Sequence, residues 1–296
     1  MAAGQRGDGV CMDSVRSVPM PNRARPLARP FRRAGRGRCA HAEDREPTRL
    51  AEREAHLWYV SPEQISDLDL LRACQEVLAP EEEQRRQQFF FPRDRHQHLV
   101  TRALVRTTLS RYAPVDPGAW RFRTNRSGRP EIVRTAGVPP LRFNVSHAPG
   151  LVALGVALET DIGVDVENTE RRGQTREVAE RFFSTAEAEA LGELPPEEQR
   201  ARFFDLWTLK ESYVKARGMG LSIPLEQFSF HLEPGQPIRI SFDSRLEDDP
   251  DAWQFAQYAP TSSHKIAVAI RRGKGPDYRI ATLPTVPLTD SGFAGR

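Results

Sequence analysis

The sequence predicts an α+β protein, because two hydrophobic periodicities alternate along one chain. Residues 162–166 alternate between hydrophobic and polar or small side chains, which indicates a strand. Leu206, Leu209 and Tyr213 recur at helical spacing, which indicates a helix with one hydrophobic side. Of the 296 residues 39% are hydrophobic, which is enough for a core in one large domain or two small ones.

The N-terminal residues 1–52 are expected to form a disordered, arginine-rich extension. Residues 1–50 contain eleven Arg and five acidic residues and show almost no hydrophobic periodicity. The net charge of +3 therefore arises in this segment, and the rest of the chain is mildly acidic. The segment superficially resembles a targeting peptide or a nucleic-acid arm, but the interspersed acids favour a dispensable extension.

The next elements are expected to alternate between strands and helices. Residues 57–60 predict an edge strand. Pro80 followed by three glutamates predicts a helix start, and a longer helix is expected over residues 94–112. Strands are expected at 143–145 and 151–158, and the second has no polar face, so both its sides should be buried.

The C-terminal part of the chain continues the same mixture. Ser184 and Glu187 form a capping box that predicts another helix start. The remaining elements are strands expected at residues 228–230, 238–242, 253–258 and 265–270, and a flexible tail over 285–296.

The strand at residues 162–167 carries two acidic side chains on one face. Asp165 and Glu167 are two residues apart, so they lie roughly 6.6 Å apart along the strand. Carboxylates at this spacing can share one hard cation such as Mg²⁺. Taken alone, such a pair is more often two solvated acids on a half-exposed strand.

The helix around residues 207–216 carries a second polar stripe. Trp207, Glu211 and Lys215 are spaced by four, nearly opposite the hydrophobic side, and Gly218 offers a helix stop. This stripe would let Glu211 and Lys215 face a cleft. The ordinary alternative is a surface ion pair between these two residues.

Several motifs together resemble one enzyme family. Besides the two stretches above, these are Gly-Arg-Pro at 128–130, Phe-Asn-Val-Ser-His at 143–147 and Arg-Phe-Phe-Ser at 181–184. In this order the chain resembles the Sfp-type 4′-phosphopantetheinyl transferases over roughly residues 57–270. The resemblance implies a pseudodimer of two similar α+β halves with the active site in the cleft between them. Here the halves would be residues 53–159 and 160–284, and the second would carry the metal site.

The resemblance also implies the reaction. Such an enzyme transfers the 4′-phosphopantetheine arm of coenzyme A to a serine of an apo acyl, aryl or peptidyl carrier protein and releases adenosine 3′,5′-bisphosphate. It implies Mg²⁺, or Mn²⁺ in its place, as the metal, and a monomer is natural for an internal pseudodimer. The pathway stays open between fatty acid, polyketide, nonribosomal peptide and lysine biosynthesis.

The resemblance assigns the catalytic residues one by one. Asp165, Glu167 and Glu211 would be the metal ligands. Glu211, directly or through a water on the metal, would take the proton of the carrier serine. Lys215 would contact the diphosphate and can protonate the leaving group.

The resemblance also assigns the residues that bind the other end of coenzyme A. Ser146, His147 and Arg85 would hold the 3′-phosphate. The loop formed by Gly128, Arg129 and Pro130 would lie along the adenine and add charge. Two departures put this clamp in doubt: Glu82 stands where relatives often have a base, and His98 stands where they have a small hydroxyl residue.

Two other classes of function stay open. Paired acids and a lysine also serve metal-dependent nucleases. These place the lysine two residues from an acid on a strand, and the mildly acidic part of the chain after residue 50 repels DNA. A non-catalytic module that binds coenzyme A and a carrier would be expected to lack a carboxylate, and none of the three is missing. No stretch is hydrophobic enough to span a membrane. Cys11, Cys39 and Cys74 show no metal or disulfide spacing, which favours the cytoplasm.

Overall fold

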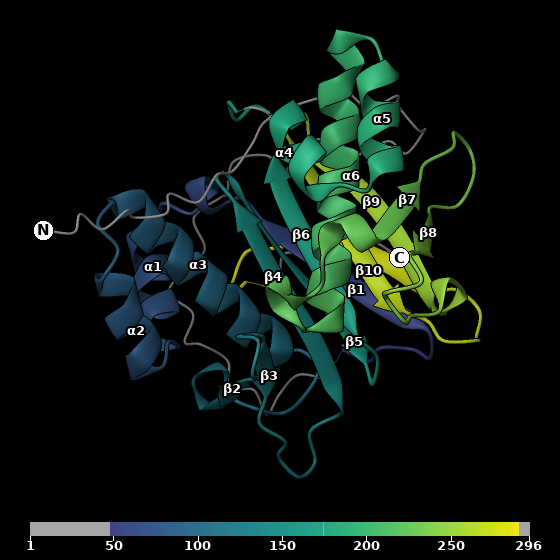
Figure 1. The fold of residues 1–296 in the computed structure, drawn as a ribbon. Helices are drawn as coiled ribbons and strands as arrows, with labels where there is room; N and C mark the ends of the chain where they lie inside the picture. Colours follow the sequence, from purple (N-terminus) through teal and green to yellow (C-terminus); the bar gives the residue numbers. More distant parts are fainter. Residues whose placement is uncertain (1–47, 174, 290–296) are drawn as a thin grey trace, which may run out of the picture.

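The computed structural model describes residues 48–173 and 175–289. One sheet has four strands in the order β11-β1-β5-β4 (Figure 1). Its strands are β1 (Glu54–Val60), β4 (Leu141–Ala148), β5 (Leu151–Leu158) and β11 (Arg279–Pro284). Strand β1 runs antiparallel to β5 and parallel to β11, so it is an inner strand. The expected edge strand at residues 57–60 is therefore wrong, because β11 comes from the end of the chain and covers that edge.

Three helices accompany the first sheet and lie to one side of it in Figure 1. They are α1 (Leu68–Glu76), α2 (Pro80–Gln87) and α3 (Pro92–Leu109). Helix α3 buries Val100 and Leu104 against Trp58 of β1 and Leu154 of β5. A small hairpin of β2 (Phe122–Thr124) and β3 (Pro130–Ile132) connects α3 to β4.

The second sheet has three strands in the order β6-β10-β9. They are β6 (Ile162–Asn168), β9 (Trp253–Thr261) and β10 (His264–Arg271). The helices of this part are α4 (Thr175–Phe182), α5 (Thr185–Glu193) and α6 (Pro196–Arg217), and a hairpin pairs β7 (Phe228–His231) with β8 (Arg239–Phe242). Short 3₁₀ turns lie at Pro62–Gln64, Pro117–Ala119, Gly220–Ser222, Leu225–Gln227 and Pro250–Ala252.

Strand β6 joins the two sheets. Val164 and Val166 point into a core that they share with Leu57 of β1 and Ala153 of β5. The other face of β6 packs against α6, as does β10. Asn144 of β4 accepts a hydrogen bond from the backbone N–H of Val164 at 2.8 Å, which fixes β4 beside β6. The structure thus confirms a mixed α+β fold in which each half contributes helices and a sheet.

The described residues test only part of the expected N-terminal extension and C-terminal tail. Residues 1–47 and 290–296 lie outside the described residues, so the extension and most of the tail stay predictions. Thr285 donates its backbone N–H to Tyr59, and Thr289 accepts from Arg111, so the start of the expected tail packs on the first sheet. None of the described helices is long and hydrophobic enough to cross a membrane.

Most local expectations for the helices and strands are confirmed. Strand β5 has the predicted bounds and is almost wholly buried. Ser184 and Glu187 form the predicted capping box, and Gly218 ends α6 with a φ of 63°. Helix α3 ends three residues before the predicted end at Tyr112.

Candidate active site

Asp165 and Glu167 both face α6, as the alternation along β6 predicts. They are only 4% and 7% exposed, so they are not solvated surface acids. Gly163 explains the close approach of helix and strand, because a Cβ at this position would lie 2.0 Å from the carbonyl oxygen of Ser212 and 2.3 Å from the backbone nitrogen of Ala216. The glycine thus lets α6 cover the two acids and exclude water from them.

The polar stripe of α6 meets these acids side chain by side chain. Trp207 donates its indole N–H to Glu167 Oε1 at 3.2 Å. Lys215 donates from Nζ to Asp165 Oδ1 at 2.5 Å. Glu211 lies between them on the helix, close enough to Asp165 for the charge of one to affect the other. We refer to Asp165, Glu167 and Glu211 as the acidic cluster.

Strand β4 brings the predicted serine and histidine beside the cluster. Ser146 is buried, accepts a hydrogen bond from Lys215 Nζ at 2.9 Å and donates to Asp165 Oδ1 at 3.2 Å. His147 is the next residue on the strand and points to the opposite side. Desolvation and the charge of Lys215, with a smaller contribution from Arg102 of α3, lower the pKa of His147.

The two glutamates of the acidic cluster have raised pKa values. Burial and the charge of Asp165 raise the pKa of Glu167 to about 8. Burial and the same charge raise the pKa of Glu211. Burial opposes the charge of Lys215, but Asp165 and Glu211 outweigh it and raise the pKa of the amine. A bound cation would favour the ionised form of these carboxyl groups, because an opposite charge nearby lowers the pKa of a carboxyl group.

The donor set suits a hard divalent cation. Asp165 Oδ2 is buried and has no hydrogen-bond partner among the described residues, which leaves one carboxylate oxygen open to a ligand. All three acids offer the oxygen donors that Mg²⁺ and Mn²⁺ prefer. As the side chains stand, no group of three His, Cys, Asp or Glu residues in the described chain is arranged to hold a metal. The fit to a metal therefore rests on the chemistry of the donors and on the open oxygen of Asp165, and not on the present arrangement of the three side chains.

The residues expected to bind the far end of coenzyme A lie on separate elements and do not form one cluster. Arg85 is exposed on α2, with its guanidinium 5.5 Å from the centre of the Phe89 ring. Gly128 has a φ of 84°, which makes the tight turn between β2 and β3. Pro130 begins β3. Gly128 is exposed and Pro130 is half-buried, so this part of the loop is open to solvent.

Arg129 is the residue of this loop whose side chain is turned inward. Its guanidinium donates to the backbone oxygen of Ala216 at 2.6 Å and to that of Ile162 at 3.1 Å, and the residue is 9% exposed. It therefore ties the hairpin of the first half to the end of α6. The charge that the loop was expected to add is thus directed at protein carbonyls.

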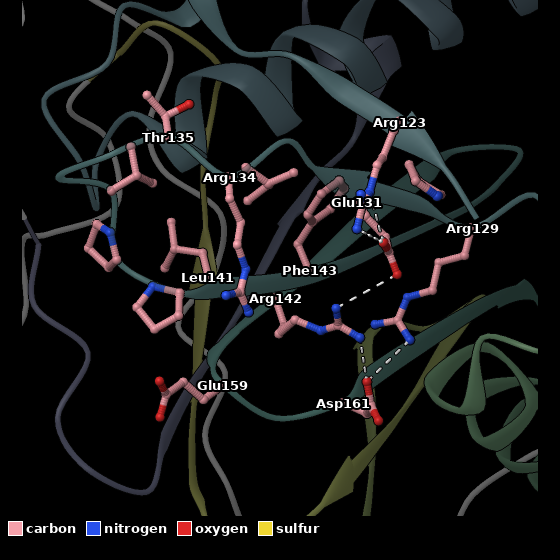
Figure 2. A pocket seen from close by; sticks show the side chains of 15 residues that line it. Arg123, Arg129, Glu131, Arg134, Thr135, Leu141, Arg142, Phe143, Glu159 and Asp161 are labelled. Atoms are coloured by element: carbon pink, nitrogen blue, oxygen red, sulfur yellow. Dashed lines mark hydrogen bonds and ion pairs between the residues drawn. The ribbon is translucent and has the colours of Figure 1, made fainter.

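A separate cavity of about 690 Å³ lies on the outer side of this loop (Figure 2). In it Arg142 pairs with Asp161 at 2.7 Å, and Arg129 lies 3.7 Å from the same carboxylate. Glu131 lies within 3.8 Å of Arg142. Arg129 and Arg142 thus already have an acidic partner, and the acidic cluster does not line this cavity.

The sequence does not single out one lysine and one arginine that lie close to the site. Lys210 precedes Glu211 in the motif, but it is fully buried and pairs with Glu187 of α5 at 2.7 Å, so it holds helices together. Arg102 is a half-buried residue of α3, and its charge contributes to the lowered pKa of His147. The signal available in the sequence was a charged residue between Val100 and Ala103 on the hydrophobic face of that helix.

Comparisons with known proteins place the chain among transferases. A family model described as 4′-phosphopantetheinyl transferase, N-terminal, matches residues 64–159, and one described as the 4′-phosphopantetheinyl transferase superfamily matches residues 161–269. The 4′-phosphopantetheinyl transferase HetI of Nostoc sp. is 33% identical over 218 residues, which cover 73% of this chain and 87% of the relative. The 4′-phosphopantetheinyl transferase Sfp of Bacillus subtilis is 32% identical over 191 residues, 64% of this chain and 81% of the relative. The human L-aminoadipate-semialdehyde dehydrogenase-phosphopantetheinyl transferase is 28% identical over 214 residues, 67% of this chain and 68% of the relative.

Proposed function

The chain belongs to the 4′-phosphopantetheinyl transferase superfamily, and we propose that the acidic cluster and Lys215 carry out the transfer. The reaction moves the 4′-phosphopantetheine arm of coenzyme A to a serine of an apo carrier protein. The nuclease alternative is dropped, because the relatives reported above are all named as transferases.

The carrier serine loses its proton to Glu211 in this proposal. A hydroxyl is a weak nucleophile until a base takes its proton. The raised pKa of Glu211, caused by burial and by Asp165, makes its carboxylate a stronger base than a solvated one. The serine oxygen forms a bond to the phosphorus that carries the pantetheine arm. The bond from that phosphorus to the bridging oxygen breaks, and the oxygen leaves on adenosine 3′,5′-bisphosphate.

Lys215 holds the leaving side of the diphosphate. Its Nζ already lies within hydrogen-bond distance of both Ser146 and Asp165, so it is fixed at the junction of β4, β6 and α6. As a positive point charge it stabilises the negative charge that develops on the leaving oxygen, and it can return a proton to that oxygen. Ser146 keeps the amine in place and offers its hydroxyl to the same phosphate.

Asp165, Glu167 and Glu211 would hold the metal ion, for which Mg²⁺ or Mn²⁺ is the proposed species. When bound, such an ion neutralises charge on the diphosphate and orients it. The open Oδ2 of Asp165 is the observation that most supports this assignment. Trp207 keeps Glu167 oriented through its indole N–H.

The observation that carries the proposal is the contact of Lys215 with both Asp165 and Ser146, which joins the three motifs in one site. The test is to incubate apo acyl, aryl and peptidyl carrier proteins with coenzyme A and Mg²⁺ or Mn²⁺ and to weigh the carriers by mass spectrometry. At least one carrier should gain one phosphopantetheine arm, and its identity names the pathway. A protein that binds coenzyme A but modifies none of them would be the non-catalytic module instead.

A further inference from the structure

Strands β4 and β6 lie side by side, although each is the outer strand of a different sheet (Figure 1). Side chains bridge the two strands. At the start of the strands, Arg142 of β4 pairs with Asp161 at 2.7 Å. Farther along, Asn144 accepts the backbone N–H of Val164 at 2.8 Å. These two bridges join the halves of the protein before the strands reach the acidic cluster.

The third bridge between the strands lies in the proposed active site itself. Ser146 donates to Asp165 at 3.2 Å, and Lys215 donates to both side chains. In the proposed function these three residues engage the ligand, because Ser146 and Lys215 contact the phosphates and Asp165 holds the metal. Their contacts with one another then change during the reaction. The spacing between the ends of β4 and β6 therefore depends on a contact farther along the strands.

That contact is made at the turn after β4. The carbonyl oxygen of Pro149 accepts a hydrogen bond from Asn168 Nδ2 at 3.1 Å and another from His264 Nε2 at 2.8 Å. Because a carbonyl oxygen only accepts, Nε2 of His264 carries the hydrogen. Asn168 is the last residue of β6, directly after Glu167, and His264 is its partner in the β6–β10 pairing. Two donors of the second half thus hold one carbonyl of the first half.

Both donors are themselves held in place. His264 is 7% exposed, and its Nδ1 lies 2.8 Å from Thr261 Oγ1. Gly150 leaves room for the ring, because a Cβ there would lie 3.0 Å from His264 Cε1 and Nε2. The amide of Asn168 is oriented by its other end, where Oδ1 accepts the backbone N–H of Glu170 at 2.8 Å. Neither donor is therefore a freely rotating surface side chain.

We propose that Asn168 and His264 are positioning residues for the transfer, an inference that rests on the proposed function. By holding Pro149, they keep Ser146 opposite the acidic cluster and Lys215 while these groups engage the ligand. A displacement of about 1 Å between reacting groups can lower a rate about 10²-fold. Loss of the two donors should therefore lower the rate of transfer far more than the affinity for coenzyme A.

The test separates alignment of the site from folding. Single-turnover rates of carrier modification at saturating coenzyme A are measured for His264→Ala, Asn168→Ala and the double variant. Calorimetry gives the dissociation constant of coenzyme A and the fraction of sites that bind it, so each rate is expressed per binding site. The rate per site should fall about 10- to 100-fold in the double variant and less in each single variant, because one donor remains. The dissociation constant should change far less than the rate.

Two further variants are controls for the hydrogen bond. His264→Gln keeps an N–H donor near the position of Nε2 and should recover most of the rate that His264→Ala loses. His231→Ala removes an exposed histidine whose Nε2 lies 2.8 Å from Ser241 Oγ in the hairpin of β7 and β8. It should match wild type in rate and in affinity.

Three results would overturn the inference. A wild-type rate per binding site in the double variant, with a lower free energy of unfolding, means a purely structural role. If the double variant does not fold, the two single variants are judged by the same comparison. Equal losses in His264→Gln and His264→Ala assign the effect to packing of the ring on Gly150. Weaker coenzyme A binding with an unchanged rate means that the two residues act on binding alone. Failure of the proposed function is distinguishable, because the wild type itself would then modify no carrier.

Discussion

Lys215 Nζ lies 2.5 Å from Asp165 Oδ1, and the other oxygen of the same carboxylate has no partner among the described residues. One oxygen is thus held by the helix and the other is left for a ligand. Burial and, after it, the charge of Asp165 raise the pKa values of Glu167 and Glu211, so Asp165 is coupled to both glutamates. The arrangement leads to predictions about pH, packing and binding.

Mg²⁺ should change how stability depends on pH. Burial and the charge of Asp165 raise the pKa of Glu167 from its ordinary value of 4.5 to about 8 in the folded protein. A carboxyl whose pKa is raised on folding contributes stability below the lower value and loses it as pH rises through the higher one. Without metal, the free energy of unfolding should therefore fall between about pH 4.5 and 8. With Mg²⁺ the slope should flatten, because the ion binds the ionised carboxylates. Denaturant titrations over this pH range test both, and identical slopes with and without the ion would contradict the metal assignment.

Gly163→Ala should be severely destabilising. Its Cβ would meet backbone atoms of α6 at 2.0 and 2.3 Å, and backbone cannot rotate away as a side chain can. We expect a loss of at least about 4 kcal/mol or failure to fold, measured by chemical denaturation. Gly192→Ala is the matched control, because nothing lies within 4 Å of a Cβ there and alanine is the better helix former. Equal stability of the two variants would show that α6 does not pack on β6 this closely.

Arg129→Met should lower stability more than coenzyme A binding. It removes two buried hydrogen bonds from a charged donor to the carbonyls of Ala216 and Ile162 and leaves both without that donor. The free energy of unfolding should fall by about 2–4 kcal/mol in denaturant titrations. Calorimetry under conditions where the variant is folded should give a dissociation constant for coenzyme A close to that of wild type. Weaker binding with unchanged stability would instead place the guanidinium on the cofactor, as the sequence predicts.

Arg181→Glu should weaken binding of the carrier protein and leave coenzyme A binding intact. Arg181 is exposed at the end of α4, and its guanidinium lies 5.1 Å from the centre of the half-buried Phe182 ring. Phe183 is buried in the core, so only the first of the two aromatic residues is available to a partner. Carrier helices are usually acidic, and a glutamate here would repel one. The Michaelis constant for the carrier should rise, whereas Arg72→Glu on α1, an exposed control, should not change it. An unchanged constant in Arg181→Glu would exclude this edge as the docking site.

The local part of this structure could be read from the sequence. The alternation on β6 places Asp165 and Glu167 on one face, and the spacing of four places Glu211 and Lys215 on one stripe of α6. The cap at Ser184 and the stop at Gly218 were equally readable, because each depends on residues within one helical turn. The family resemblance added the order of the halves, which the two matching family models support.

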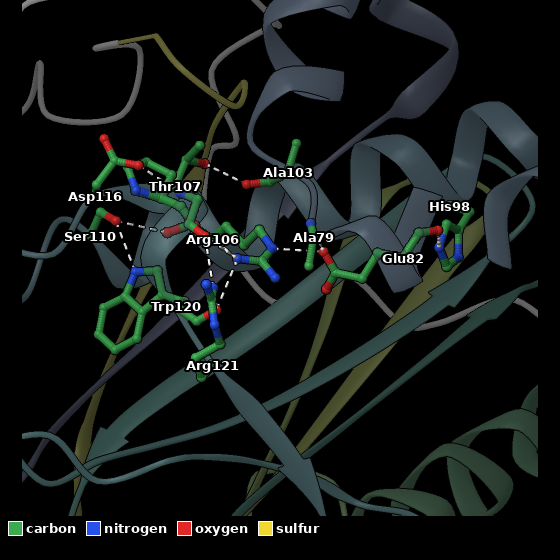
Figure 3. Close-up of polar contacts among 12 residues, drawn as sticks. Ala79, Glu82, His98, Ala103, Arg106, Thr107, Ser110, Asp116, Trp120 and Arg121 are labelled. Carbon is green, nitrogen blue, oxygen red and sulfur yellow. Dashed lines mark hydrogen bonds and ion pairs between the residues drawn. The ribbon is translucent and has the colours of Figure 1, made fainter. Parts of the chain in front are cut away.

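The remaining features depend on contacts between distant residues. Glu54 of β1 pairs with Arg279 of β11, 225 positions later, and no local pattern announces that strand pairing. Arg129 turns inward because the last carbonyls of α6 are close to it, and those carbonyls belong to the other half. Glu82, whose charge the sequence sets against an anion, is bound to Arg106, which lies 24 positions later (Figure 3).

The central claim is that the acidic cluster performs the transfer, and the most direct measurement is the single-turnover rate of carrier modification in Asp165→Asn and Glu211→Gln. Both substitutions keep the side-chain volume and remove one charge. The rate should fall by about 10²- to 10⁴-fold in each while coenzyme A still binds. Glu170→Gln, an exposed acid just after β6, should retain the wild-type rate. Wild-type rates in either cluster variant, or full turnover in excess chelator, would contradict the account.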